Sequence, residues 1–170
     1  MLHAWKMPPF EVQVRPLRAL DVPHLEWHGG ADWRCFYEQT SALHYAGDVL
    51  YLVADINGFP AAQIILYWRG KDAHPHIPDI QSFRVHPMLR GQGVGSELLR
   101  VAERVAQQYG RTQVSLSVAL DNPKARRLYE RCGYRVVGES YETGWETVDA
   151  RGEPLRFRET ILDMVKELKE

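Results

Sequence analysis

The chain has 170 residues, which is enough for one domain with a buried core, and we expect a single domain over residues 1–170. Apolar residues make up 45% of it and charged residues 25%, a composition that excludes intrinsic disorder. The formal net charge of −1 provides no strong field, which argues against nucleic acid and anionic membranes as partners. The two cysteines form no CxxC pair, no signal peptide is visible and no run of 18 apolar residues occurs, so we expect a cytoplasmic protein.

The first half of the chain predicts a strand, two helices and a β-hairpin. Alternating apolar residues predict the strand over residues 10–15. Two apolar, β-rich runs flank Asn57-Gly58, a dipeptide typical of two-residue hairpin turns. Between strand and hairpin, helices are predicted over residues 18–28 and 31–45, and their candidate core residues are Trp33, Phe36, Tyr37 and Leu43.

A loop over residues 70–78 separates the hairpin from a further predicted strand over residues 79–86. Residues 94–109 predict a helix that ends at Gly110, a typical helix C-terminal glycine. Residues 113–120, QVSLSVAL, alternate between apolar and small or polar side chains and predict another strand. The apolar stripe of the predicted helix consists of Val94, Leu98, Val101, Ala102, Val105 and Tyr109.

The dipeptide Asn122-Pro123 is typical of an N-cap followed by the first helical residue, and this short helix is predicted to close near Gly133. A strand from Tyr134, a turn-rich loop through about residue 154 and a final strand over residues 156–165 complete the chain. This order of elements indicates a mixed α/β domain without a dividing linker.

Residues 90–96, RGQGVGS, place three glycines and an arginine between a predicted strand and a predicted helix. Glycine adopts positive φ and has no Cβ, so the amides of such a turn and of the helix N-terminus are suited to holding an anion. Arg90 adds a positive charge at the rim and Ser96 a hydroxyl group. The alternative is a tight turn without a ligand, and the turn alone does not decide between the two.

Two other phosphate-binding motifs do not fit this turn. The Rossmann fingerprint needs G-x-G-x-x-G and an acidic residue about 20 positions later. Here the glycines run G-x-G-x-G, and the following strand contains no acidic residue. A Walker A loop is excluded because no Gly-Lys-Ser/Thr follows.

Residues 79–134 resemble the GNAT family, the acetyl-CoA-dependent N-acetyltransferases. The stretch FRVHPMLRGQGVGSELL is similar to the family's strand–turn–helix motif, whose pyrophosphate loop reads R/Q-x-x-G-x-G/A. About 30 residues later, DNPKARRLYERCGY is similar to the segment N-x-x-A-x-x-L-Y-x-x-x-G-F/Y. The matching positions are Asn122, Ala125, Leu128, Tyr129, Gly133 and Tyr134.

The resemblance implies an α/β, single-domain GNAT-like fold: a mixed, mostly antiparallel central sheet flanked by helices, with a splayed pair of parallel strands that forms the cofactor slot. It also implies acetyl-CoA as the cosubstrate and no metal. Main-chain groups of Phe83, Arg84 and Val85 are then expected to bind pantetheine, with the Val85 N–H as the donor to the oxyanion. The pyrophosphate is expected at Arg90, Gly91, Gln92, Gly93, Val94, Gly95 and Ser96.

Two further roles follow from the resemblance. Tyr129 is expected to protonate the departing thiolate, since the corresponding thiol has a pKa of about 8.5 and benefits from a proton at neutral pH. The alternative is that Tyr129 is an aromatic side chain packed beside Leu128. Asn122 is expected to bond pantetheine from the start of its helix, and capping of that helix is an alternative that is compatible with this role.

The general base is the least defined part of the prediction. Asp79 lies four residues before Phe83, which resembles the position of a glutamate base in some family members, and it is our candidate. Its ordinary pKa of about 3.9 makes it a poor base without burial or a relaying water, and the alternative is a solvated residue at a strand edge. Glu142 is a second candidate with less support.

Other reactive residues receive simpler interpretations. The pairs His24/His28 and His74/His76 lack the partners of a closed zinc site and are interpreted as surface histidines. Cys132 precedes a helix-ending glycine and is interpreted as a packing residue rather than a carrier of acetyl groups. The first helical region is expected either to line the acceptor pocket or to pack in the core with its aromatic residues Trp27, Trp33, Tyr37 and Tyr45.

We therefore predict an N-acetyltransferase that moves an acetyl group from acetyl-CoA directly to a primary amine of a small molecule or peptide. The expected partner is this amine, with no nucleic acid and no membrane, and the chain is a candidate homodimer. A non-catalytic acyl-CoA-binding module is the alternative from another class, and the glycine spacing disfavours a nucleotide-dependent oxidoreductase.

Overall fold

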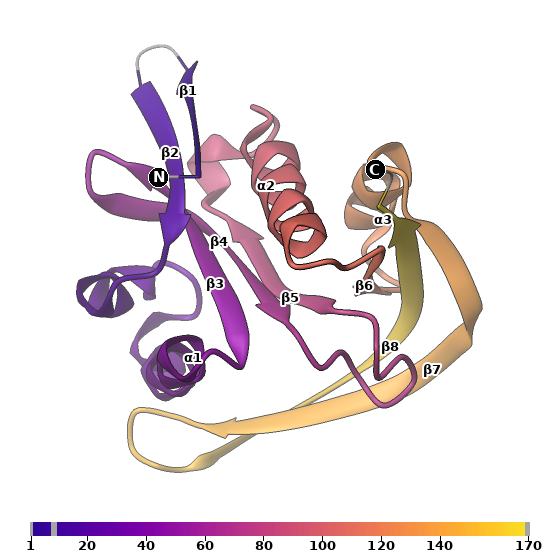
Figure 1. Ribbon diagram of the computed structural model, residues 1–170. Helices are drawn as coiled ribbons and strands as arrows, with labels where there is room; N and C mark the ends of the chain where they lie inside the picture. Colours follow the sequence, from indigo (N-terminus) through magenta and orange to yellow (C-terminus); the bar gives the residue numbers. More distant parts are fainter. Residues whose placement is uncertain (1, 8–9, 169–170) are drawn as a thin grey trace.

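The computed structural model describes residues 2–7 and 10–168. Its strands form one sheet in the order β1-β2-β3-β4-β5-β6-β8-β7, in which β5 and β6 are the parallel neighbours (Figure 1). The strands are β1 (His3–Met7), β2 (Phe10–Pro16), β3 (Val49–Ile56), β4 (Phe59–Tyr67), β5 (Asp79–Val85), β6 (Gln113–Ala119), β7 (Arg135–Val148) and β8 (Pro154–Glu167). The α-helices are α1 (Arg34–Ala46), α2 (Val94–Gln108) and α3 (Pro123–Arg131).

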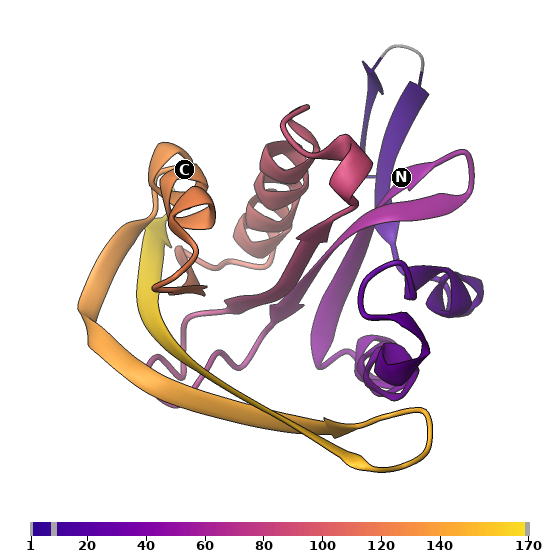
Figure 2. The same cartoon turned by 180° about the vertical axis from the view of Figure 1, so that it is seen from behind.

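The sheet is covered on both faces, and strand β3 shows how its sequence achieves this. Successive side chains of a strand point to opposite faces. Leu52 and Ala54 accordingly pack in the core beneath α2, whereas Tyr51 and Val53 pack in a second core with α1. Figure 2, seen from behind, shows α1 and α2 on opposite sides of the central strands. The predicted mixed, mostly antiparallel sheet flanked by helices is therefore confirmed.

The hairpin and the helices of the second half follow their sequence patterns closely. β3 and β4 are joined by Asn57 and Gly58, both at positive φ (53° and 89°), as a two-residue hairpin turn requires. Within the predicted stripe of α2, only Tyr109 is misplaced: it is 70% exposed, because it lies at the C-cap beyond the last helical turn. The other five residues of that stripe are buried.

The region between β2 and α1 differs from its prediction. Residues 18–28 do not form an α-helix, but a 3₁₀ helix over Ala19–Leu25, and a second one covers Gly30–Trp33. Pro23 lies inside the first and has no N–H to donate, and Gly29 (φ 85°) ends the segment in the left-handed region. The predicted core residue Leu43 on α1 is 37% exposed, whereas Tyr37 is fully buried.

The turn-rich loop predicted before residue 154 is wrong, because the chain forms a long two-stranded arm there. The pairing of β7 with β8 runs from Arg135 opposite Val165 to Val148 opposite Pro154, with a register shift between Val137 and Tyr141. Gly138 lies in this bulge with a φ of 70°. The arm crosses beneath the sheet and reaches α1 (Figure 1). Strand β1 was also missed by the sequence pattern.

Candidate active site

Strands β5 and β6 separate from each other soon after they begin. Their pairing is confined to Asp79 with Ser115 and Ile80 with Leu116, although both strands continue beyond these pairs. The backbone groups of β5 that would face β6 are therefore left without a strand partner. This arrangement confirms the predicted splayed parallel pair.

A β-bulge shapes the open part of β5. Two of its residues, Ser82 and Phe83, face one residue of β4, and Ser82 has a φ of 48°, which is uncommon for a residue with a side chain. The buried Gln63 holds this bulge: its Nε2 donates to the Ser82 carbonyl (3.2 Å), and its Oε1 accepts from the Tyr51 hydroxyl (2.8 Å). Gln63, itself oriented by Tyr51, therefore fixes the backbone of β5 where it turns into the slot.

The glycine turn before α2 uses its glycines in two ways. Gly91 and Gly93 have φ values of 75° and 84°, and a Cβ on either would meet no atom within 4 Å. Gly95 corrects our prediction, because it is helical; its added Cβ would lie 3.2 Å from Phe83 Cζ and 3.4 Å from Val85 Cγ2. The first two shape an open turn, and the third lets α2 approach β5 closely.

The turn presents donors around the helix N-terminus. Glu97 N donates to Gly93 O (3.1 Å) as the first helical bond, so the amides that precede it in α2 are left for water or a ligand. Arg90 is exposed, and its Nε donates to the Val85 carbonyl (3.1 Å), which ties the turn to the end of β5. Gln92 donates to the Met88 carbonyl (3.0 Å). The segment therefore fits an anion such as a diphosphate.

Helix α3 supplies the two residues predicted from its motif. Tyr129 is 8% exposed and its ring centroid lies 6.2 Å from that of Phe83, at the side of the slot. Burial raises the pKa of Tyr129 to about 12, so its phenol carries its proton at neutral pH. Asn122 caps the helix: its Oδ1 accepts from Ala125 N (3.1 Å), which leaves its side-chain N–H groups for another partner.

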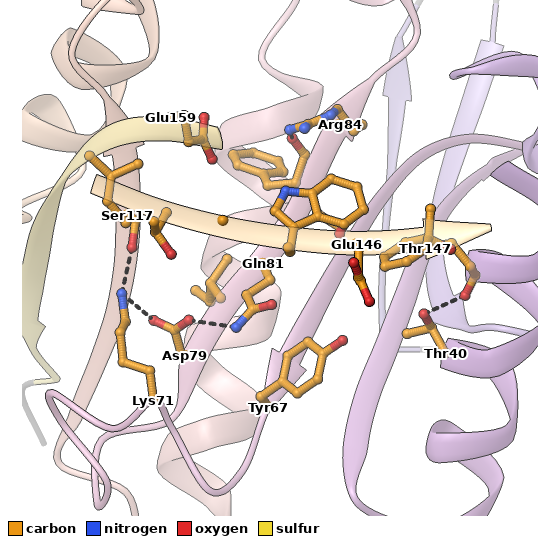
Figure 3. Close-up of a pocket in the computed structure, with 18 of the residues that line it drawn as sticks. Thr40, Tyr67, Lys71, Asp79, Gln81, Arg84, Ser117, Glu146, Thr147 and Glu159 are labelled. Atoms are coloured by element: carbon orange, nitrogen blue, oxygen red, sulfur yellow. Dashed lines mark hydrogen bonds and ion pairs between the residues drawn. The ribbon is translucent and has the colours of Figure 1, made fainter. Parts of the chain in front are cut away.

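Asp79 is buried, which rules out the alternative of a solvated strand-edge residue. It is 2% exposed and accepts hydrogen bonds from Ser115 Oγ (2.7 Å) and Gln81 Nε2 (2.9 Å). The Lys71 ammonium lies 3.3 Å from its Oδ1 (Figure 3). The same ammonium lies 2.7 Å from Asp163 Oδ1. Both carboxylate oxygens of Asp79 therefore already have hydrogen-bond or ion-pair partners within the protein.

A cleft of about 810 Å³ joins these groups. Its walls come from β5, α1, the 71–73 loop and the β7–β8 arm, and Tyr129 and Asp79 both line it (Figure 3). Of the four aromatic residues expected near an acceptor, Trp33 lines the cleft. Glu142, the second candidate base, is not among the lining residues and faces Arg158 at 3.6 Å on the surface. The sequence pattern missed four aromatic lining residues: Phe36, which was predicted as a core residue, and Tyr67, Tyr141 and Trp145.

His28 is not a simple surface histidine. Its Nε2 accepts a hydrogen bond from Arg84 Nε (3.0 Å) at the edge of the cleft. Burial, and then the charge of Arg84, lower the pKa of His28 to about 4. Cys132 is partly buried and packs against the core, as its predicted packing role requires, and burial raises the pKa of its thiol.

This low pKa makes the stability of the fold sensitive to mild acid. The unfolded chain protonates His28 near pH 6.5 and the folded chain near pH 4, so folding stability is complete above pH 6.5 and falls as the pH drops towards 4. At about 1.4 kcal/mol per pKa unit the loss of folding stability is at most about 3.5 kcal/mol, and we expect about half of this for a partly exposed ring. In urea titrations, His28→Asn should remove this loss between pH 6.5 and 4. An unchanged pH slope in the variant would contradict this assignment.

Comparison with known proteins agrees with this geometry. The model of the acetyltransferase (GNAT) family matches residues 4–134. The chain is 34% identical over 105 residues to the aminoalkylphosphonate N-acetyltransferase of Salmonella typhimurium, an alignment that covers 61% of this chain and 68% of that protein. The chain belongs to the GNAT acetyltransferase family. This membership confirms, at the level of the family, the predicted enzyme class and acetyl-CoA as cosubstrate.

Other relatives show the same family relationship with different coverage. The thialysine N-epsilon-acetyltransferase of Sus scrofa is 33% identical over 89 residues, which cover 52% of this chain and 48% of that protein. This GNAT chain thus spans about half the length of that relative. Among solved structures, the ribosomal-protein-S18-alanine N-acetyltransferase of Escherichia coli has a TM-score of 0.67 at 21% identity, covering 94% of this chain and 95% of its own. The yncA protein of Salmonella typhimurium, solved with its cofactor acetyl-CoA, has a TM-score of 0.63 at 20% identity with the same coverage.

Within residues 2–7 and 10–168, no helix is long and apolar enough to cross a membrane. The same part of this GNAT chain holds no group of three or more His, Cys, Asp or Glu side chains placed to bind a metal ion.

Proposed function

We propose that this chain transfers an acetyl group from acetyl-CoA to the primary amine of a small molecule or peptide. The observation that carries the proposal is the separation of β5 from β6 beside an amide-rich turn, with Tyr129 in the wall of an open cleft. The relatives named for aminoalkylphosphonate and thialysine support an amine as the acceptor. A cytoplasmic location and a homodimer remain predictions.

The residues present fit the cosubstrate. Bound acetyl-CoA supplies the thioester. Phe83, Arg84 and Val85 belong to the part of β5 that has no pair in β6, where their main-chain groups are placed to bind its pantetheine arm. The open turn from Arg90 to Ser96 is placed to bind its diphosphate through backbone amides. Asn122 offers its free side-chain N–H groups to the same arm.

Little further chemistry is required from the protein. The amine must be aligned with the thioester carbonyl, whose oxygen receives a hydrogen bond from the Val85 N–H as charge develops there. A C–N bond forms, the C–S bond breaks, the nitrogen loses a proton and the sulfur gains one. Tyr129 lines the cleft and carries its proton at neutral pH, so its phenol is the proposed donor of the proton that the sulfur gains.

We retain Asp79 as the proposed acceptor of the amine proton. It can accept this proton once Ser115 or Gln81 releases its hydrogen bond to one of the Asp79 carboxylate oxygens. Asp79→Asn keeps the side-chain size and removes the base. We expect kcat/KM to fall about tenfold or more at pH 7 and the deficit to shrink towards pH 9–10, where free amine becomes abundant. Measured pH profiles decide the role, since a deficit that is equal at every pH would assign Asp79 to structure only.

Thiol release from acetyl-CoA in the presence of a panel of amines tests the proposed function. Amine-dependent release supports it. Binding of acetyl-CoA without release for any amine would instead favour the non-catalytic acyl-CoA-binding module.

A further inference from the structure

We propose that the acceptor is an arylalkylamine, a primary amine joined by a short alkyl linker to an aromatic ring. This inference rests on the proposed acetyl transfer and adds the class of amine. It starts from the outer wall of the cleft, which is built from aromatic side chains of several elements. These rings are Trp33 before α1, Phe36 on α1, Tyr67 on β4, and Tyr141 and Trp145 on β7.

The rings of this wall hold one another in place. The Trp33 centroid lies 5.2 Å from that of Trp145 and 5.6 Å from that of Phe36. Trp145 is also stacked on Phe157, a ring behind the wall, with centroids 4.2 Å apart and an interplanar angle of 18°. A wall that is already ordered loses little conformational entropy when it binds a flat ring.

The dimensions of the cleft suit an aromatic ring carried on a linker. The outer wall and the inner residues Phe83 and Tyr129 line one cavity of about 810 Å³, which is within the range of sites for organic ligands. Tyr129 and Trp145 both line this cavity, so an amine held beside Tyr129 can carry its ring towards the outer wall. A short aliphatic amine would leave the outer rings uncovered.

The charges around the cleft favour a cation and disfavour an anionic acceptor. Its carboxylates are Asp72, Asp79, Glu146 and Glu159, and its cations are Lys71 and Arg84 (Figure 3). Lys71 is already shared between Asp79 and Asp163. A phosphonate or carboxylate group on the acceptor would therefore meet mainly like charge, whereas an ammonium group is attracted into the cleft.

Thr147 gives an independent sign of a polar group on the ligand. Thr147 lines the cleft, and its hydroxyl oxygen is buried without a hydrogen-bond partner among the described residues. A buried hydroxyl without a partner is destabilising, and a hydrogen-bonding group on a bound ligand relieves this cost. A hydroxyl on the far edge of the ring, as in tyramine, offers such a group.

Steady-state thiol release at saturating acetyl-CoA tests this inference with 2-phenylethylamine, tyramine, n-butylamine, spermidine and 2-aminoethylphosphonate. We expect kcat/KM for the two arylalkylamines to exceed that for the other amines by about tenfold or more, since only these two bury an aromatic ring against the outer wall. Trp145→Ala should raise the KM for 2-phenylethylamine about tenfold without changing the KM for acetyl-CoA or for n-butylamine. Trp145→Phe should largely restore it.

A matched control removes an aromatic ring elsewhere. Tyr109→Ala deletes an exposed ring at the end of α2, outside the cleft, and should leave all constants unchanged. Should Trp145→Ala fail to fold, Phe36→Leu removes a wall ring at similar volume and should raise the same KM several-fold.

The outcomes separate this inference from the function on which it rests. A preference for spermidine or 2-aminoethylphosphonate, or an unchanged KM in the wall variants, would overturn the arylalkylamine class and leave acetyl transfer standing. No thiol release with any amine would overturn both.

Discussion

Tyr129→Phe is expected to lower kcat about 10²-fold while acetyl-CoA binds with its original affinity. The substitution removes one hydroxyl group and keeps the ring, which packs 6.2 Å from both Phe83 and Tyr134. The cofactor slot and the helix should therefore be unchanged. Only proton donation to the departing sulfur is lost, and this affects the chemical step rather than binding.

Two measurements distinguish this loss from a structural one. Binding by calorimetry should be equal in both proteins, and the defect should be smaller for a thioester whose thiol has a lower pKa, because that sulfur needs the proton less. Unchanged turnover in Tyr129→Phe would remove the proton-donor role and leave Tyr129 as a packing residue.

Arg15→Met is expected to destabilise the fold by about 3–5 kcal/mol, a large part of the 5–15 kcal/mol that holds a typical domain. Arg15 on β2 is 6% exposed and bonds two buried carboxylates: Nη1 and Nη2 reach Asp21 at 2.6 and 2.8 Å, and Nε reaches Asp55 at 2.8 Å. Burial alone would raise the pKa of Asp21, but the hydrogen bonds from Arg15 and from Arg18 N hold it below its ordinary value. Without Arg15, two buried carboxylates remain without their cation.

Urea unfolding measures this effect, with Arg126→Met as the matched control. Arg126 pairs with Glu130 on the exposed face of α3, so its loss should cost about 0.5 kcal/mol or less. The stabilisation from Asp21 is present above its unfolded pKa of about 4 and is lost as the pH falls below it. The difference between Arg15→Met and the original chain should therefore narrow below pH 4. A cost equal to that of the control would contradict this account of Arg15.

The segment from β5 to α3 could be predicted from sequence because local patterns determine it. The apolar period of α2 and the alternation in β6 are properties of neighbouring residues, and Asn122 caps α3 with its own side chain. The predicted cofactor residues Phe83 to Ser96 therefore lie together around the slot.

The acceptor side of the site could not be predicted in this way. On β7, Tyr141 and Trp145 are interspersed with glycines and exposed acidic residues, a composition that is typical of loops. They become a wall only because the arm folds back onto Trp33, over 100 residues earlier in the chain. Lys71 likewise meets Asp163 across 92 residues, through the pairing of β6 with β8. No local pattern reports contacts of this kind.

Calorimetric titration of the folded protein with acetyl-CoA tests most directly whether the turn at residues 90–96 and the slot beside β5 hold the cosubstrate. We expect one molecule to bind per chain with a dissociation constant in the range of about 1 μM to 1 mM. Gly95→Val should weaken this binding about tenfold or more, because its side chain would collide with Phe83 and Val85. Absence of binding at millimolar acetyl-CoA, or full affinity in Gly95→Val, would contradict the account.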